Sequence, residues 1–109
     1  MQSAHTYVRL DKADFQFCAA HFCVFPGERE PLHGHNYRVY VELRGPTDDF
    51  GYVAEFGWVK RQVRELVAIL DHRVLIASEC PGLSVSTAVG QVDVQWQADS
   101  WSFPEGGVV

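Results

Sequence analysis

The segment GEREPLHGHNYRVYVEL, from Gly27 to Leu43, begins as a charged loop with a proline and ends as an alternating strand. Side chains alternate between the two faces of a strand, so residues two positions apart share a face. One face carries His33, His35, Tyr37, Val39, Val41 and Leu43, and the other carries Asn36, Arg38, Glu42 and Arg44. This pattern predicts a strand over His33–Arg44 whose apolar face begins with two histidines.

The sequence on either side predicts further strands. Thr6–Phe25 is rich in aromatic and β-branched residues, which favour a strand, and it is interrupted near Asp11–Ala13. Val92–Phe103 alternates apolar and polar residues around a turn at Asp99-Ser100, which predicts a β-hairpin. Loops or turns are predicted at Gly27–Leu32, Gly45–Thr47, Asp48–Gly51 and Cys80–Gly90.

An apolar stripe predicts a helix over Phe56–Leu70. Intervals of three and four residues separate the members of the stripe, which are Phe56, Val59, Val63, Leu66, Val67 and Leu70. Two strands, a helix and a hairpin in this order predict an α+β fold with an antiparallel sheet.

Composition limits the classes of partner. A chain of 109 residues makes one domain, and a net charge of −5 argues against nucleic acid or an anionic membrane surface as partner. No apolar run approaches the roughly 20 residues that a membrane helix needs. The three cysteines have irregular spacing, which we interpret as reduced thiols in a cytoplasmic protein.

Three histidines form a candidate metal site. His33 and His35 project to one side of their strand, and His21 comes from the end of the preceding strand across a loop. If the two strands pair antiparallel, the three imidazoles meet at one end of the sheet, as a catalytic zinc site with one open position requires. His-x-His alone is a weak motif, and two surface histidines are the alternative. The shared face with Tyr37 and Val39 favours partial burial of His33 and His35, and buried imidazoles need partners.

Other candidate groups have plain structural alternatives. Cys18 and Cys23 flank His21 and suggest a Cys/His site, but we expect both to be small core residues. Asp71-His72 is either a solvent-exposed pair at a helix end or a proton shuttle in which the aspartate orients the histidine. Glu30 is either loop charge or a general acid/base near the first proposed ligand.

Four motifs together resemble a known family. FCAAHF, LHGHNYRVYVELRG, GYVAEFGWVK and LDHRVL occur in this order within Phe15–Leu75. They resemble the 6-pyruvoyltetrahydropterin synthase family, which includes the 6-carboxytetrahydropterin synthases of queuosine biosynthesis. The resemblance implies a tunnelling fold, a catalytic zinc held by His21, His33 and His35, and catalytic roles for Asp71 and His72. It also implies a homo-oligomer, a trimer or hexamer of joined sheets.

The loop before the histidines separates the subtypes of this family. Arg29 stands where the 6-carboxytetrahydropterin synthases carry a cysteine, and the sequence instead reads Glu30-x-x-His-Gly-His. This resembles the type III members, as does the later WSFPEGG. The resemblance implies cleavage of the side chain of 7,8-dihydroneopterin triphosphate, which gives 6-hydroxymethyl-7,8-dihydropterin for folate synthesis. We expect partial desolvation to raise the pKa of Glu30 toward neutrality, so that it can shuttle a proton.

The sequence departs from the family pattern in two places. Glu55 replaces an aspartate, and we find no counterpart before Val109 of the family's last helix and two strands, which carry a glutamate that anchors the pterin. We therefore expect a single domain over residues 1–109 that lacks those elements. Two alternatives stay open: a 6-carboxy- or 6-pyruvoyltetrahydropterin synthase activity that uses Cys23, and a non-catalytic zinc-binding remnant.

Overall fold

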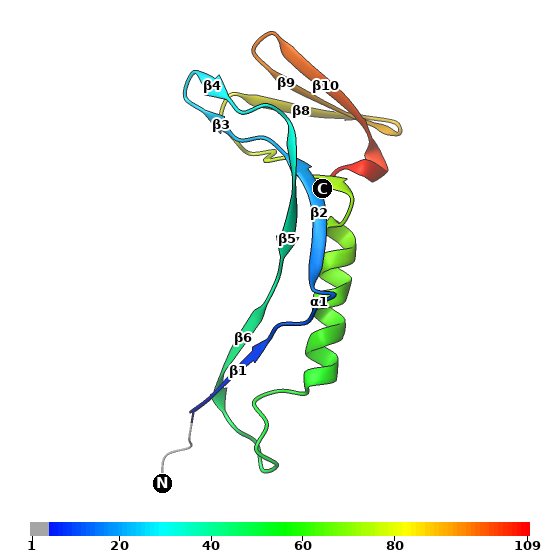
Figure 1. Ribbon diagram of the computed structural model, residues 1–109. Helices are drawn as coiled ribbons and strands as arrows, with labels where there is room; N and C mark the ends of the chain where they lie inside the picture. The colour runs from blue at the N-terminus through cyan, green and yellow to red at the C-terminus, as the bar shows by residue number, and fades with distance from the viewer. Residues whose placement is uncertain (1–4) are drawn as a thin grey trace.

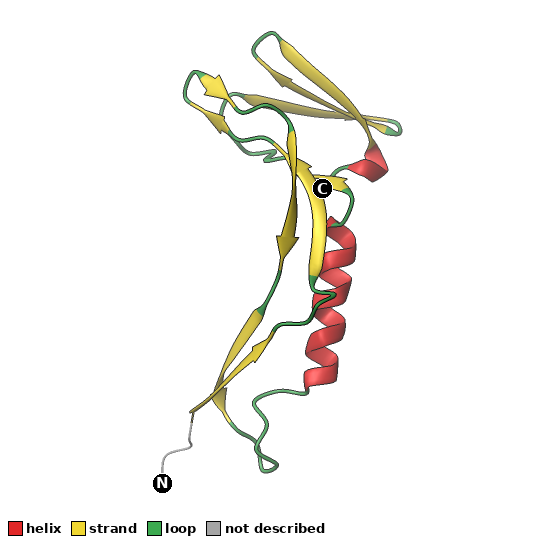
Figure 2. Ribbon diagram, viewed as in Figure 1, coloured by secondary structure: helices red, strands yellow, loops and turns green. Residues whose placement is uncertain are grey.

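The computed structural model describes residues 5–109, which form a long, bent ribbon with one helix along it and a small sheet at one end (Figure 1). Two adjoining strand pairs make the ribbon (Figure 2). The strands are β1 (His5–Leu10), β2 (Gln16–His21), β3 (Val24–Phe25), β4 (Glu28–Arg29), β5 (His33–Arg38), β6 (Val41–Pro46), β7 (Arg73–Val74), β8 (Leu83–Ala88), β9 (Gln91–Trp96) and β10 (Asp99–Pro104). The helices are α1 (Phe56–Leu70) and a 3-10 turn, η1 (Glu105–Gly107).

Each of the two long sides of the ribbon is interrupted once, between β1 and β2 and between β5 and β6. β1 pairs antiparallel with β6, and β2 pairs antiparallel with β5. The break after β1 confirms the interruption predicted near Asp11–Ala13. The predicted strand His33–Arg44 is wrong in two details, because it breaks at Val39–Tyr40 and because Gly45 and Pro46 pair within β6 instead of turning. The Val39 N–H donates to the Phe15 carbonyl at 2.8 Å, which closes the ribbon across the break.

Helix α1 has the predicted bounds. Its N-cap is Glu55, whose side chain accepts a hydrogen bond from the Trp58 N–H at 2.8 Å. The helix core consists of Val59, Val63 and Val67 with Leu10 and Phe15. Leu66, which the stripe also includes, is 61% exposed, because a two-stranded ribbon is too narrow to cover the whole apolar face.

A second core lies under the sheet β8–β9–β10. The hairpin core consists of Phe22, Val92 and Val94, and the Trp101 ring stacks on Phe22 with centroids 4.7 Å apart. The β9–β10 hairpin confirms the prediction, but its turn is at Gln97–Ala98, and the predicted turn residues belong to β10. The loop predicted at Cys80–Gly90 is wrong, since it contains β8. The alternation Leu83-Ser84-Val85-Ser86 is typical of a strand, and it turns Leu83 and Val85 toward the hairpin core.

The fold is α+β and mostly antiparallel, as predicted. The exception is β7, which pairs in parallel with β2. The predicted loop Gly27–Leu32 also contains structure, because β3 and β4 form a two-residue hairpin around Gly27, whose φ of 81° suits glycine. No helix among residues 5–109 is long and apolar enough to cross a membrane.

The chain is far from spherical. Its principal extents are 63 × 29 × 23 Å and its radius of gyration is 19.2 Å, whereas a compact domain of this length has a radius of about 13 Å. The two cores lie at separate levels of the ribbon, so much of the ribbon surface is uncovered in a single chain.

Candidate functional site

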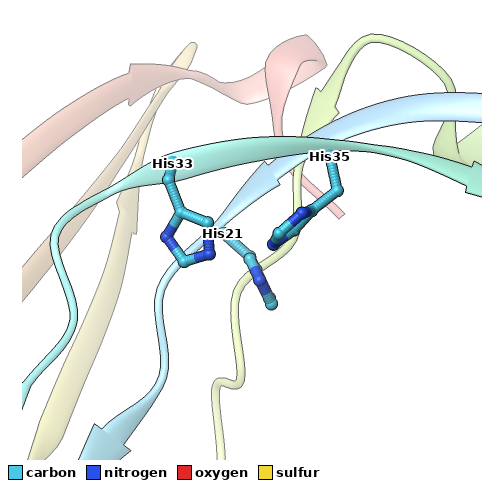
Figure 3. A group of neighbouring side chains, drawn as sticks. All are labelled: His21, His33 and His35. Atoms are coloured by element: carbon cyan, nitrogen blue, oxygen red, sulfur yellow. The ribbon is translucent and has the colours of Figure 1, made fainter.

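Three imidazoles converge at the end of the β2–β5 pair (Figure 3). His21 lies directly opposite His33 in the antiparallel register, and His35 lies opposite Ala19. The ring centroids of His21 are 4.7 Å from His33 and 5.2 Å from His35. One nitrogen from each ring lies within 4.8 Å of the other two, so the group could hold a metal ion. The predicted strand pairing is therefore confirmed, and metal binding by these residues stays a prediction.

The surroundings of the imidazoles orient two of them. The His33 Nδ1 lies 2.7 Å from the Pro31 carbonyl oxygen, so Nδ1–H donates a hydrogen bond to this oxygen and Nε2 is left to act as a ligand. The Tyr37 ring meets His35 edge-on at 5.6 Å. His33 is half-buried as expected, and His21 is half-buried too, but the expected burial of His35 is wrong, since this residue is exposed.

Glu30 stands beside His21. Its Oε1 accepts a hydrogen bond from the Cys23 N–H at 3.0 Å, and its own N–H donates to the Cys23 carbonyl at 2.9 Å. Ligand atoms of His21, Cys23 and Glu30 lie within 4.8 Å of one another. The β3–β4 hairpin creates this proximity, because it folds the Glu30 loop back onto the end of β2.

The predicted pKa shift of Glu30 is wrong in sign. Hydrogen bonding from the Cys23 side chain and its backbone N–H holds the pKa of this carboxyl below its ordinary value, and it outweighs desolvation. The Cys23 thiol responds in the opposite direction, since its hydrogen bond to Glu30 and its desolvation raise its pKa. Glu30 is therefore ionised near neutral pH, and the thiol is protonated.

The prediction that both cysteines near His21 are small core residues is wrong. Cys18 and Cys23 are exposed and not part of a core. Cys23 lies in the irregular connection between β2 and β3, where side chains no longer alternate between two faces. The nearness of Cys23 to Glu30 has no signal in the sequence, since it depends on the β3–β4 hairpin.

Asp71 and His72 lie at the end of α1, away from the three imidazoles. Asp71 Oδ1 accepts from the Cys18 N–H at 2.9 Å and lies 3.0 Å from His72 Nδ1. The His72 N–H donates to the Cys18 carbonyl. Cys18 precedes His21 by three residues, which corresponds to about 10 Å along a strand. Among residues 5–109, neither residue joins a group of close metal-ligand atoms.

Hydrogen bonds hold the carboxylate of this pair in place. The Cys18 N–H is the main cause that lowers the pKa of Asp71, and the His72 side chain adds to it. The His72 side chain is 81% exposed, and its backbone has a φ of 59°. Within one chain the structure thus matches the solvent-exposed alternative, and the catalytic role of Asp71 and His72 stays a prediction.

An open pocket adjoins His21. It has a volume of about 490 Å³, in the range of small-molecule sites. Its lining is mostly apolar and includes His21, Phe22, Cys23, Leu75, Ile76 and Cys80. Sequence reasoning did not find the contribution of Leu75, Ile76 and Cys80, because β7 brings that segment beside β2 through a parallel pairing.

Known proteins are similar to this chain in sequence and in fold. Residues 10–90 match the family model described as 6-pyruvoyl tetrahydropterin synthase. A protein of Archaeoglobus fulgidus named "Putative 6-carboxy-5,6,7,8-tetrahydropterin synthase" is 43% identical over 61 residues, which cover 54% of this chain and 51% of that protein. A Pyrococcus abyssi protein of the same name is 33% identical over 66 residues, which cover 59% of this chain and 40% of that protein.

Solved structures extend the similarity over the whole described chain. A crystal structure of 6-pyruvoyl tetrahydropterin synthase from Plasmodium vivax superposes with a TM-score of 0.88 at 32% identity, covering 97% of this chain and 66% of that one. The Plasmodium falciparum enzyme gives 0.87 at 31% identity, covering 99% and 66%. The predicted tunnelling fold is thereby confirmed. The chain spans about half the length of the curated relatives that it matches and two thirds of these structures.

Proposed function

Because the chain belongs to the 6-pyruvoyl tetrahydropterin synthase family, we propose that it is a zinc-dependent pterin lyase. Its substrate would be 7,8-dihydroneopterin triphosphate, and its product 6-hydroxymethyl-7,8-dihydropterin for folate synthesis. The observation that carries this proposal is the position of Glu30, whose carboxylate lies within 4.8 Å of a His21 nitrogen and of the Cys23 thiol.

The donor set fits zinc. Three neutral imidazoles with one open side are a common ligand set of catalytic zinc, and the Pro31 carbonyl orients one of them. His21, His33 and His35 would hold the ion. A zinc ion supplies Lewis acidity, which makes a substrate hydroxyl easier to deprotonate.

Glu30 has the properties of the base. Its lowered pKa keeps it ionised near neutral pH, so it can take the proton from the second side-chain hydroxyl of the substrate. The bond between the first and second side-chain carbons then breaks, and its electron pair passes into the pterin ring. The second carbon leaves as an aldehyde with the triphosphate, and the first carbon takes back a proton to become hydroxymethyl.

A relative supports this role. Two Plasmodium vivax structures are of catalytic-residue mutants in which a glutamate is replaced by cysteine or by alanine. We assign the corresponding role in this chain to Glu30. We further propose that Asp71 and His72 assist proton transfer. Their distance from the imidazoles within one chain makes a neighbouring subunit or a bound substrate necessary for that assistance.

One observation favours a second function. Cys23 lies beside Glu30 and His21, so a 6-carboxy- or 6-pyruvoyltetrahydropterin synthase activity could use its thiol. The raised pKa of the thiol weighs against it, because the thiolate is the reactive form. Cys23→Ala separates the two, since the second function is lost in this variant and the first is kept.

The test is turnover with and without metal. The purified protein is assayed for zinc content by mass spectrometry and incubated with 7,8-dihydroneopterin triphosphate, and the pterins are separated by chromatography with fluorescence detection. We expect one zinc per chain and release of the hydroxymethyl pterin, lost with a chelator and restored by zinc. Zinc binding without any pterin turnover would overturn the lyase and support the non-catalytic remnant.

The shape of the chain bears on its assembly. Since the ribbon leaves wide surfaces uncovered, we propose a homo-oligomer, a trimer or hexamer, in the cytoplasm, where the described free cysteines stay reduced. Light scattering after gel filtration measures the mass, and a monomer at micromolar concentration would contradict it.

A further inference from the structure

Arg29 joins the loop of Glu30 to the β9–β10 hairpin. Its Nε and Nη2 donate to the same Asp99 carboxylate oxygen at 3.1 and 2.9 Å, and its Nη1 donates to the Glu30 carbonyl at 3.0 Å. Figure 1 shows the β3–β4 hairpin at the same end of the molecule as β9 and β10. Arg29 therefore contacts the hairpin and the peptide of Glu30 at the same time.

Aromatic rings complete this connection. The guanidinium carbon of Arg29 lies 4.7 Å from the centroid of the Trp101 ring, within the range of a cation–π contact. The same ring stacks on Phe22, the residue after His21. Trp101 thus contacts the segment that carries His21 through Phe22, and the segment that carries Glu30 through Arg29.

The setting of Arg29 differs from that of an ordinary surface ion pair. Exposed ion pairs contribute little, because water screens them and their side chains stay mobile. The Arg29 side chain is 24% exposed, the lowest value among the arginines that form ion pairs in residues 5–109. Its two donors on Asp99 and its stacking on Trp101 restrict it to one orientation.

We infer that Arg29 is a positioning residue, which fixes the Glu30 peptide so that the Glu30 carboxylate stays beside His21. Three hydrogen bonds hold Glu30: the Arg29 bond to its carbonyl and two bonds with the Cys23 backbone. The following residue, Pro31, carries the carbonyl that orients His33. Loss of Arg29 frees this peptide, so it loosens both the carboxylate and the orientation of one imidazole.

The first test needs no enzymatic activity. In Arg29→Met the side chain keeps its length and apolar contacts but loses its three donors. Hydrogen exchange is measured by NMR at the Cys23 and Glu30 amides, which depend on the contact between the two segments. We expect both amides to exchange at least about tenfold faster in Arg29→Met than in the original protein. In Arg29→Lys their exchange rates should lie between those two. Unchanged exchange would overturn the inference.

A matched control separates positioning from general loss of stability. Arg64→Met removes an arginine that pairs with Asp14 and lies over the Phe15 ring, but at the other end of β2. It should leave exchange at Cys23 and Glu30 unchanged. Equal acceleration in this control would refute the inference. Asp99→Asn keeps an acceptor and serves if Arg29→Met does not fold; it should accelerate the two amides less than the methionine variant, and no acceleration there would count against the inference.

The second test rests on the proposed function. Loss of a group that orients a functional side chain costs about 10- to 100-fold, so kcat of Arg29→Met, given per bound zinc, should fall by this factor while KM stays the same. A higher KM with an unchanged kcat would contradict the positioning of Glu30. If the original protein turns over no pterin, the proposed function fails, and the exchange measurement still decides the role of Arg29.

Discussion

Replacement of Glu30 by glutamine tests the site most directly. The two side chains have nearly the same shape, and the amide oxygen of glutamine can still accept the hydrogen bond that the Cys23 N–H donates at 3.0 Å. The loop should therefore keep its position. What changes is chemical: a side chain that takes up a proton is replaced by one that does not.

The size of the effect follows from these two facts. A positioned general base contributes about 10²- to 10⁴-fold to a rate, and the glutamine variant keeps the geometry, so kcat should fall by at least about 100-fold. Zinc is held by the three imidazoles and not by Glu30 in our proposal. Since the substitution removes none of the proposed ligands, the variant should still bind one zinc per chain.

The assay combines zinc titration with single-turnover kinetics on 7,8-dihydroneopterin triphosphate. Glu28→Gln is the matched control, because Glu28 lies in the same hairpin but is exposed and has no role in the site. This control should behave as the original protein does. The reasoning would be refuted by a Glu30→Gln variant with full turnover, or by one that binds no zinc although it is folded.

Three further predictions concern metal binding, pH and packing. His21→Ala should weaken zinc binding by more than the roughly 100-fold that an outer partner contributes, measured by competition with a coloured chelator, while His72→Ala should keep zinc; equal affinities in both would contradict the site. Asp71 has a lowered pKa, so the stability it contributes is present above its ordinary value near 3.8 and is lost as pH falls below it; thermal unfolding followed from pH 6 to 3 should decline less steeply in Asp71→Asn, and identical curves would argue against it. Phe15 is 0% exposed, so Phe15→Ala should cost about 3–5 kcal/mol in urea unfolding, against less than about 0.5 kcal/mol for Phe50→Ala, whose ring is 85% exposed.

The sequence predicted those features of the fold and the site that depend on residues close together in the chain. The bounds of α1 follow from its apolar periodicity, and its N-cap Glu55 directly precedes it. The common face of His33 and His35 follows from strand parity, and the position of His21 follows from antiparallel pairing of neighbouring strands.

Features that depend on distant or irregular contacts were not predictable. Cys23 reaches Glu30 only because a two-residue hairpin reverses the chain, and the same contact reverses the expected pKa shift of Glu30. The parallel pairing of β7 places Asp71 and His72 beside Cys18 and not beside the imidazoles. The local pattern of residues 70–75 does not indicate the parallel pairing of β7 with β2.

The site also has a consequence for how the chain is made. All the proposed metal ligands and Glu30 come from residues 21–35, and β2 pairs with β5 across one connection. Closing a loop of about a dozen residues costs little entropy compared with a contact between distant segments. The imidazoles can thus come together before α1 and the β9–β10 hairpin leave the ribosome. A zinc ion captured at that stage would stabilise the β2–β5 pair as a template onto which the later elements fold.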